Sequence, residues 1–415
     1  MARYAVIADD LTGAGDSGVH FAAAGLRTAL ALEPVGIGRA FTEHDAVAFS
    51  TESRFLPAEE AADRVGVAIN ACRQAGASVF FKKIDSTLRG NLAAEIGTAM
   101  REGRFAAAVV CPAMPKTGRT VVEGRLYVGG VPVDRTELGC DPFNPVPSSF
   151  IPDLLSGLSC GGVSLEVVRK GEAAVAERIG WLVADGRNAI IVDAESDSDM
   201  AILGAATRSR NSDGGQCVLP VGAGGFAEAF AGEPRPRRGE EASGRLLAVV
   251  GSLTAASAEQ ISHAGASGLF TVLELDMERV LADPAGEIAR LAEAAENSNR
   301  HLLLANARPP RKASASGVSR DDGLAAAALF GRAAREIAVK GACGRVYATG
   351  GGTAVAVAAA MGFDSITLER ECMPGVVLGS CRSPDVPVRW FITKAGGFGA
   401  SDTLTRLVGR PLPAL

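Results

Sequence analysis

Short apolar runs alternate with amphipathic stretches along most of the chain. Such runs predict buried strands, which we place in the first half at Tyr4–Ala8, Arg27–Leu32, Ala46–Ser50, Ser78–Phe81 and Ala106–Cys111. Apolar positions at helical spacing predict helices at Gly15–Ala24, Pro57–Ala75 and Leu92–Arg101. The second half repeats the pattern, with strands expected at Leu246–Val250, Phe270–Leu275, Leu302–Ala305, Arg345–Ala348 and Val388–Ile392, and helices at Ala255–Ala264, Asp321–Val339 and Thr353–Met361. This alternation is typical of parallel sheets covered by helices on both faces, so we expect an α/β fold.

A break in this alternation divides the chain. Residues 231–241 hold Pro, Gly and charged residues without apolar periodicity, a composition typical of an exposed linker. A length of 415 residues also favours two domains. We therefore predict domains at 1–232 and 244–415 joined by a linker at 233–243, each domain a mostly parallel sheet flanked by helices. Residues 112–160, rich in Pro and Gly, are expected to form long loops or a small insertion.

Composition narrows the class of protein. The 42 Lys and Arg against 47 Asp and Glu give a net charge of −5, which argues against a general nucleic-acid binder. The 8 Cys are scattered and there are 4 His, so a zinc site is not expected. Scattered Cys, and a start that runs into Asp9-Asp10 instead of a signal peptide, favour the cytoplasm. No apolar stretch of about 18 residues occurs, so no membrane span is expected.

The residues that follow the predicted strands differ between the two halves. Ligands of open parallel sheets bind beyond the carboxyl ends of the strands. In the first half these positions carry charged and hydroxyl side chains, at Asp9-Asp10, Thr51–Arg54 and Lys82–Arg89. In the second half they carry glycine, at 251, 350–352, 396, 397 and 399. We therefore expect a polar small molecule on the first half and a phosphate-bearing ligand on the second.

Asp9 and Asp10 are the first candidates for catalysis. Two adjacent carboxylates at the end of a buried strand repel each other unless a cation or a hydrogen-bond donor compensates them. They would serve as a general base and as a group that orients a hydroxyl or Mg²⁺; alternatively, an Asp here caps the following helix.

The loop Lys82–Asn91 combines lysines, a carboxylate, hydroxyls and an arginine, a mixture that suits a sugar acid. Arg54 is a further candidate anion clamp.

Glycine is the unusual residue of the composition, with 50 in 415 residues against about 7% in average proteins. The run Gly350-Gly351-Gly352-Thr353 follows a predicted strand and opens a predicted helix, where bare amides and the helix dipole bind phosphate. Gly251-Ser252 can act in the same way, and Gly396–Gly399 lets the backbone pass close to a nucleotide. The pattern G-x-x-x-x-G-K-[ST] is absent, so no P-loop is expected.

Another glycine motif competes with this interpretation. Gly13–Gly18 matches G-x-G-x-x-G after the first strand, which would suit an NAD(P)-dependent oxidoreductase. Asp9 and Asp10 lie between the strand and the first glycine, where their charge would repel a pyrophosphate. Gly13–Asp16 is also locally similar to the signature of ribokinase-type sugar kinases, which keeps Asp16 as a lesser candidate for the base.

Several of these motifs together resemble one known family. Segments over nearly the whole chain look like the four-carbon acid sugar kinases, at Ile7–Ala14, Lys83–Asn91, Cys111–Pro115, Gly118–Thr120, Asp141–Val146 and Met373–Gly375. The resemblance implies a two-domain α/β kinase that phosphorylates threonate-, erythronate- or tetronate-type acids with ATP. It also implies that the first domain binds the sugar acid and the second binds the nucleotide, in agreement with the difference between the strand ends.

The resemblance assigns residues to both ligands. It implies substrate contacts at Asp9, Arg54, Lys83, Ile84, Asp85 and Ser86, and ATP contacts at Ser252, Gly350, Gly351, Gly352, Thr353 and Gly396. This chain departs from the family pattern where Gly352 replaces an Asp or Glu and where Ala395 replaces a Ser. Loss of a carboxylate and a hydroxyl near the phosphates would weaken the binding of Mg²⁺ or ribose.

We therefore predict an ATP- and Mg²⁺-dependent kinase of a small sugar acid, with an active-site cleft between the domains. Lys83 and Arg54 would hold the substrate's carboxylate, and Asp10, Asp9 or Asp85 would take the proton of the hydroxyl. The sequence does not rank these three, and it identifies neither the acid, the metal ligands nor the oligomeric state, for which a homodimer stays open. Two alternatives remain, a sugar-acid-binding homologue that is non-catalytic or uses another donor, and the oxidoreductase built on the first glycine motif.

Overall fold

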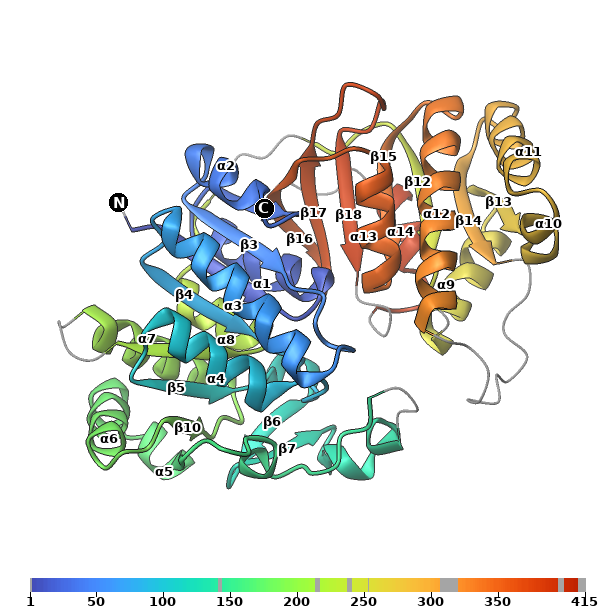
Figure 1. The fold of residues 1–415 in the computed structure, drawn as a ribbon. Helices are drawn as coiled ribbons and strands as arrows, with labels where there is room; N and C mark the ends of the chain where they lie inside the picture. Colours follow the sequence, from blue (N-terminus) through green and yellow to red (C-terminus); the bar gives the residue numbers. More distant parts are fainter. Residues whose placement is uncertain are drawn as a thin grey trace. The chain divides into compact units, whose positions relative to one another are not determined.

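The computed structural model describes residues 2–140, 144–212, 217–236, 241–252, 254–306, 320–394 and 399–409. Its contacts divide the chain into two compact units, Met1–Arg235 and Pro236–Leu415 (Figure 1). The expected functional boundaries at 232 and 244 stay a prediction, and residues 237–240 of the expected linker lie outside the described residues. None of the described helices combines the length and the apolar character that a membrane crossing requires.

The first unit is built on a parallel sheet. Its strands lie in the order β2 (Thr28–Ala31), β3 (Ala46–Ser50), β1 (Tyr4–Ala8), β4 (Val79–Lys83), β11 (Val218–Gly222), β5 (Ala107–Cys111), β10 (Ala189–Val192) and β9 (Cys160–Val163). Neighbouring strands are parallel throughout. The expected strands of the first half are confirmed, and β9, β10 and β11 are additions that the apolar runs did not predict. Central strands such as β5 are buried along their whole length, as expected for a sheet that is covered on both faces.

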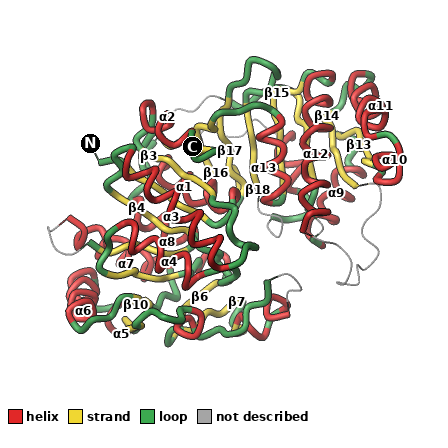
Figure 2. Tube along the Cα trace, in the orientation of Figure 1, coloured by secondary structure: helices red, strands yellow, loops and turns green. Residues whose placement is uncertain are grey.

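Helices cover both faces of this sheet (Figure 2). They are α1 (Leu11–Ala23), α2 (Gly36–Glu43), α3 (Ala58–Gln74), α4 (Leu92–Gly103), α5 (Leu165–Val168), α6 (Glu172–Ala184), α7 (Asp197–Ser212) and α8 (Gly224–Ala231). The connection from β1 to β2 crosses the sheet in one direction and that from β3 to β4 in the other, so right-handed crossovers place α1 and α3 on opposite faces. Accordingly, α3 packs against α2 and α4, whereas α1 packs against α8.

Successive side chains of β4 pack against different helices on the two faces of the sheet. Phe81 of β4 packs on Phe226 and Phe230 of α8, with ring centroids 5.7 and 6.1 Å apart. The next residue, Lys82, points to the other face because successive strand residues alternate. There its Nζ lies 2.7 Å from Oε2 of Glu95 in α4, and the two side chains are 0% and 2% exposed. Removing one partner of such a buried ion pair typically costs about 3–5 kcal/mol, so this pair fixes α4 on the sheet.

Residues 112–160 hold the small insertion that the sequence predicted. Strands β6 (Arg119–Val122), β7 (Arg125–Val128) and β8 (Val131–Pro132) form an antiparallel sheet of their own. Short 3₁₀ turns surround it, at Pro115–Thr117, Val133–Arg135, Glu137–Cys140 and Ile151–Leu154. Residues 141–143 lie outside the described residues.

The second unit has a mixed sheet. Its strands lie in the order β13 (Phe270–Leu275), β14 (His301–Asn306), β12 (Arg245–Val250), β15 (Cys343–Thr349), β18 (Trp390–Lys394), β17 (Val376–Cys381) and β16 (Ser365–Met373). Strands β13 to β18 in this order are parallel, and β17 is antiparallel to both β18 and β16. The helices are α9 (Ala255–Ala266), α10 (Met277–Ala282), α11 (Pro284–Glu296), α12 (Arg320–Lys340), α13 (Gly351–Ala360) and α14 (Thr403–Gly409).

The antiparallel hairpin β16–β17 is the main difference from the expected second half. Its turn contains Gly375, whose φ of 72° lies in the left-handed region that favours glycine. The expected strand Val388–Ile392 also begins later, at Trp390. The prediction of a mostly parallel α/β unit is confirmed.

Candidate active site

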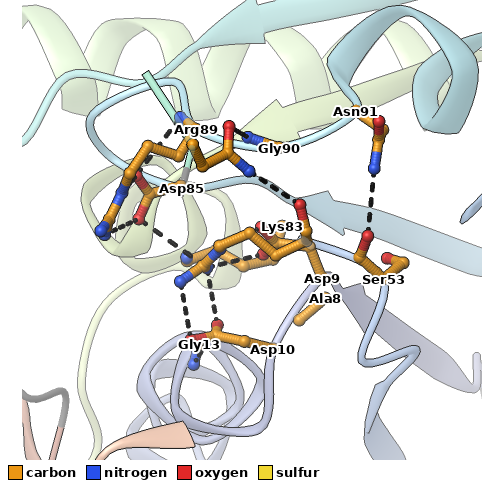
Figure 3. A network of polar contacts seen from close by, with 12 residues as sticks. Ala8, Asp9, Asp10, Gly13, Ser53, Lys83, Asp85, Arg89, Gly90 and Asn91 are labelled. Carbon is orange, nitrogen blue, oxygen red and sulfur yellow. Dashed lines mark hydrogen bonds and ion pairs between the residues drawn. The ribbon is translucent and has the colours of Figure 1, made fainter. Parts of the chain in front are cut away.

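The carboxyl ends of β1, β3 and β4 bring together the substrate residues that were predicted in the first half. Ala8 at the end of β1 is in register with Ser50 of β3 and with Lys83 of β4. The segments that follow these strands therefore start at one edge of the sheet, where their polar side chains form the network of Figure 3. The predicted substrate residues are all buried there, at Asp9, Arg54, Lys83, Ile84, Asp85 and Ser86.

Arg54 is the centre of this network. Its Nε and Nη2 donate to Oδ2 and Oδ1 of Asp9 at 2.7 and 3.0 Å. Its Nη1 donates to Oδ2 of Asp10 at 2.9 Å, and its Nη2 lies 3.7 Å from Oδ1 of Asp85. Burial by itself lowers the pKa of Arg54, but the three carboxylates raise it well above its usual value. Arg54 thus compensates the adjacent aspartates, and its expected contact with the substrate's carboxylate stays a prediction.

Asp10 also determines where α1 begins. Its Oδ1 accepts a hydrogen bond from the amide of Gly13 at 2.9 Å, and its Oδ2 accepts one from the hydroxyl of Thr12 at 2.8 Å. Because this N-cap satisfies a first-turn amide, the helix starts at Leu11 and not at Gly15 as expected. Burial raises the pKa of Asp10, but the charges of Arg54 and Lys83 outweigh this effect and lower it below its ordinary value. Asp10 is therefore ionised at neutral pH.

Asp85 shapes the loop that follows β4. Its Oδ2 and Oδ1 accept hydrogen bonds from Nε and Nη2 of Arg89 at 2.8 and 3.1 Å. The hydroxyl of Thr87 also donates to Oδ2. Burial raises the pKa of Asp85, but Arg54 and Arg89 outweigh this effect and hold it far below its ordinary value. All three carboxylates named as candidate bases thus lie in one charged cluster.

Gly13 allows Lys83 to approach the start of α1. A Cβ atom on Gly13 would lie 2.9 Å from Nζ of Lys83 and 2.4 Å from Oδ1 of Asp10. No side chain fits in this space without displacing a charged group. The role of this glycine is therefore close packing of the cluster.

The dinucleotide interpretation of Gly13–Gly18 is wrong. These residues all lie inside α1, which begins directly after the Asp10 cap. A dinucleotide motif needs its first glycine in the tight turn between strand and helix. Asp16 of the same motif faces α8, where a Cβ on Gly224 would lie 2.6 Å from its Oδ2. The Gly13–Gly18 motif therefore does not support an oxidoreductase.

Two asparagines that were not predicted as site residues hold the backbone around Arg54. Nδ2 of Asn144, from the insertion, donates to the carbonyl of Arg54 at 2.9 Å. Nδ2 of Asn91 donates to the carbonyls of Ser53 and Leu56 at 3.1 and 2.9 Å. Both asparagines lie in segments that carry the family resemblance, which is the one signal that pointed to them. Their partners are distant backbone groups, so the sequence gives no indication of what they bind.

The glycine segments of the second unit also meet at strand ends. Val250 of β12 is in register with Thr349 of β15, which is in register with Lys394 of β18. The segments after these three strands therefore start at one edge of the second sheet. Gly396, predicted to contact ATP, lies outside the described residues.

The other residues predicted to contact ATP lie together at the start of α13, with Gly251 beside them. They are Ser252, Gly350, Gly351, Gly352 and Thr353. A Cβ atom on Gly251 would lie 2.1 Å from Oγ1 of Thr353, and one on Gly350 would lie 3.6 Å from Cβ of Ser252. Gly350 is the N-cap of α13 with a φ of 94°, a conformation that favours glycine. A Cβ on Gly352 would meet nothing within 4 Å. An open helix N-terminus of this kind suits a phosphate group.

Family models match both units. A model described as the sugar-binding N-terminal domain matches residues 4–230, and one described as the nucleotide-binding C-terminal domain matches residues 247–404. The chain is 37% identical to the D-threonate kinase of Bordetella bronchiseptica, over 97% of this chain and 95% of the relative. It is 33% identical to the 3-oxo-tetronate kinase of Methylobacterium radiotolerans, over 96% of this chain and 97% of the relative. It is 31% identical to the D-erythronate kinase of Heliobacterium modesticaldum, over 100% of each.

Solved structures share the fold. A protein from Salmonella typhimurium LT2 has a TM-score of 0.79 at 22% identity, over 98% of each chain. A protein from Bordetella bronchiseptica, described with bound citrate as a domain-swapped dimer, has a TM-score of 0.50 at 34% identity, over 98% of this chain and 97% of that one. Near full-length matches to named kinases and to both domain models lead to one conclusion: the chain belongs to the four-carbon acid sugar kinase family.

Proposed function

We propose that this chain is an ATP-dependent kinase that phosphorylates a hydroxyl of a four-carbon sugar acid such as threonate, erythronate or 3-oxo-tetronate. The observation that carries the proposal is the cluster in which Arg54 binds Asp9 and Asp10 beside Lys83. It combines an ionised carboxylate with positive charge at the strand ends where such a fold binds its ligand. The activities named for the relatives support this class of substrate.

The first unit would bind the sugar acid. Lys83, with Arg54 beside it, would supply positive charge for the substrate's carboxylate, and Ile84, Asp85 and Ser86 would complete the site. Citrate in the related Bordetella bronchiseptica structure is also a small carboxylic acid, which agrees with this type of ligand.

Asp10 is our choice for the base among the three aspartates. Its side chain is 14% exposed, against 4% for Asp9 and 10% for Asp85, so it is the most accessible to a substrate. All three aspartates accept hydrogen bonds on both oxygens, so accessibility is the property that favours Asp10. An ionised aspartate orients the attacking hydroxyl and accepts its proton as the phosphoryl group is transferred.

The second unit would bind ATP. Backbone amides at Ser252 and Gly350–Thr353, together with Gly396, would hold the phosphates at the N-terminus of α13. Among the described residues no group of three or more His, Cys, Asp or Glu is placed to hold a metal ion. Mg²⁺ would therefore bind chiefly through the phosphate oxygens of ATP, as it commonly does, and would neutralise their charge.

Two further features belong to this proposal. A metabolic kinase that consumes ATP agrees with the expected location in the cytoplasm. A homodimer agrees with the description of the Bordetella bronchiseptica structure as a dimer. Sedimentation velocity of the purified protein would measure its oligomeric state.

A coupled assay of ADP release tests the function. We expect turnover with at least one acid in a panel of D- and L-threonate, D- and L-erythronate and 3-oxo-tetronate, with ATP and Mg²⁺. D10N should lower kcat by about 10²- to 10⁴-fold, because it removes the base while the amide oxygen can still cap α1. D63N, on the exposed surface of α3, is the matched control and should keep full activity.

Three results would contradict parts of this proposal. No ADP release with any acid would overturn the kinase assignment. Tight binding of an acid by calorimetry without turnover would favour the non-catalytic homologue. Near-normal kcat in D10N would remove Asp10 from the mechanism and leave Asp9 and Asp85 to be tested in the same way.

A further inference from the structure

Glu52 is a carboxyl group next to the cluster for which the proposed mechanism has no use. It lies in the loop after β3, between Ser50 and Arg54. Its Oε1 accepts a hydrogen bond from the amide of Leu11 at 2.8 Å and another from the hydroxyl of Ser50 at 2.6 Å. Leu11 directly follows Asp10, so Glu52 binds the backbone of the proposed base's own turn.

The backbone of Glu52 is held in an unusual conformation. Its φ of 47° lies in the left-handed region, which residues other than glycine seldom adopt. On either side of it, the amides of Thr51 and Ser53 donate to the carbonyls of Ala8 and Asp9 at 2.9 and 3.0 Å. These bonds to the end of β1 fix the loop, and the strained residue between them directs its side chain to α1. Strain of this kind persists where the surrounding structure fixes it, often near a functional site.

The two caps of α1 act on amides two residues apart. Asp10 accepts from the amide of Gly13 through its side chain, and Glu52 accepts from the amide of Leu11. Loss of the Glu52 contact would leave the first amide of the helix without its partner and free the turn that carries Asp10. The direct bonds of Arg54, Thr12 and Gly13 to the Asp10 carboxylate would remain, but the backbone that carries it would be less firmly held.

We propose that Glu52 is a positioning residue: by holding the amide of Leu11 it fixes the Asp10 carboxylate in the orientation from which it accepts the substrate's proton. This inference rests on the proposed function, since it takes Asp10 as the base. Glu52 itself need not touch the substrate.

Burial, more than the charges around it, favours a neutral Glu52 side chain. Asp10 faces it from α1, Arg54 lies in its own loop, and Arg64 of α3 donates to the carbonyl of Thr51 at 3.3 Å. Burial raises the pKa of Glu52 to about 7; the charge of Asp10 acts in the same direction, whereas Arg54 and the hydrogen bonds from Ser50 and Leu11 oppose it. A protonated Glu52 keeps its Oε1 as an acceptor and adds no further negative charge to the cluster. Glutamine is therefore the closest substitute for this form.

Three variants test this role. E52A should lower kcat by about 10- to 100-fold with KM within about threefold, because misplacing a catalytic group costs rate more than binding. E52Q should restore most of that kcat, because its amide oxygen can still accept from the amide of Leu11. E59Q is the matched control, because Glu59 is exposed in the first turn of α3. A kcat of E52A equal to that of the wild type, or of E52Q as low as that of E52A, would overturn the inference.

Hydrogen exchange separates this inference from the proposed function. Absence of ADP release in the wild type with every acid would refute the kinase assignment alone. Exchange of the amides of residues 9–14, measured by mass spectrometry, then decides on Glu52. Faster exchange in E52A, with protection restored in E52Q, would support positioning of this turn, and equal exchange in all three proteins would overturn it.

Discussion

Arg54 binds the carboxylate of Asp9 through two parallel hydrogen bonds, from Nε to Oδ2 at 2.7 Å and from Nη2 to Oδ1 at 3.0 Å. Its remaining nitrogen donates to Asp10 at 2.9 Å. One planar guanidinium therefore compensates two adjacent buried carboxylates, which no single ammonium group can do with the same geometry. The cluster depends on the shape of this side chain as well as on its charge.

Substitution of Arg54 by lysine should therefore damage both activity and stability. R54K keeps the positive charge but loses the paired hydrogen bonds to Asp9. We expect kcat/KM to fall by at least about 100-fold and the free energy of unfolding to fall by about 2–4 kcal/mol. R27K is the control, because Arg27 is 63% exposed and makes one long contact with Asp45 at 3.4 Å. Urea unfolding and ADP release measure the two effects, and wild-type values in R54K would contradict this interpretation.

Gly13 should not tolerate a methyl group. In G13A the added Cβ would stand 2.4 Å from Oδ1 of Asp10 and 2.9 Å from Nζ of Lys83. We expect a loss of about 1–3 kcal/mol of stability and at least about a tenfold loss of kcat. G38A is the matched control, because a Cβ at this position of α2 meets nothing within 4 Å. It should stabilise the protein by about 0.5–1 kcal/mol, and equal behaviour of both variants in a thermal melt would argue against close packing at Gly13.

Gly352 has room for the carboxylate that the family pattern carries. Its Cβ position is open and its φ is outside the left-handed region. G352D should fold normally and gain about 0.3–1 kcal/mol from its charge in the first turn of α13. We expect ADP release to depend more steeply on Mg²⁺ and to increase at saturating Mg²⁺. G352N has the same shape without the charge, so identical Mg²⁺ titrations of the two variants would show that a carboxylate here has no role.

The titration of Glu52 should appear as a dependence of stability on pH. The folded protein keeps this proton up to about pH 7, whereas the unfolded chain loses it from pH 4.5 upward. Stability of the wild type therefore falls between these values, by up to about 3 kcal/mol, and stays level above pH 7. E52Q lacks this loss. Urea unfolding should find E52Q more stable than the wild type at pH 8 and equal to it at pH 4.5, and a constant difference would refute the raised pKa.

Apolar runs predicted strands at the centre and at the edges of the sheets, but they missed β9, β10, β11, β16 and β17. β1, β3 and β5 are buried along nearly their whole length, so their sequences are continuous apolar runs. β16 is only partly buried and contains Glu369, Arg370 and Glu371, so it has no such run. The insertion of β11 between β4 and β5 depends on long-range pairing, which a local pattern does not contain.

At the candidate site the sequence predicted which segments meet, but not which side chains contact one another. The rule that ligands bind at strand ends predicted which segments would meet, because the register of Ala8 with Ser50 and Lys83 follows from parallel pairing. Which side chain binds which could not be predicted. Glu52 reaches an amide 41 positions away and Asn144 a carbonyl 90 positions away. Such contacts depend on the geometry of loops, which residue type and spacing do not determine.

Lys82 and Lys83 are neighbours in the sequence but lie on opposite faces of β4. Lys82 holds α4 through its ion pair with Glu95, and Lys83 faces the charged cluster at the start of α1. Two adjacent residues therefore serve different parts of the structure, one the packing of a helix and the other the charged cluster. An insertion or deletion of one residue within β4 would exchange the two lysines between these tasks, so this strand should be far less tolerant of length changes than of substitutions.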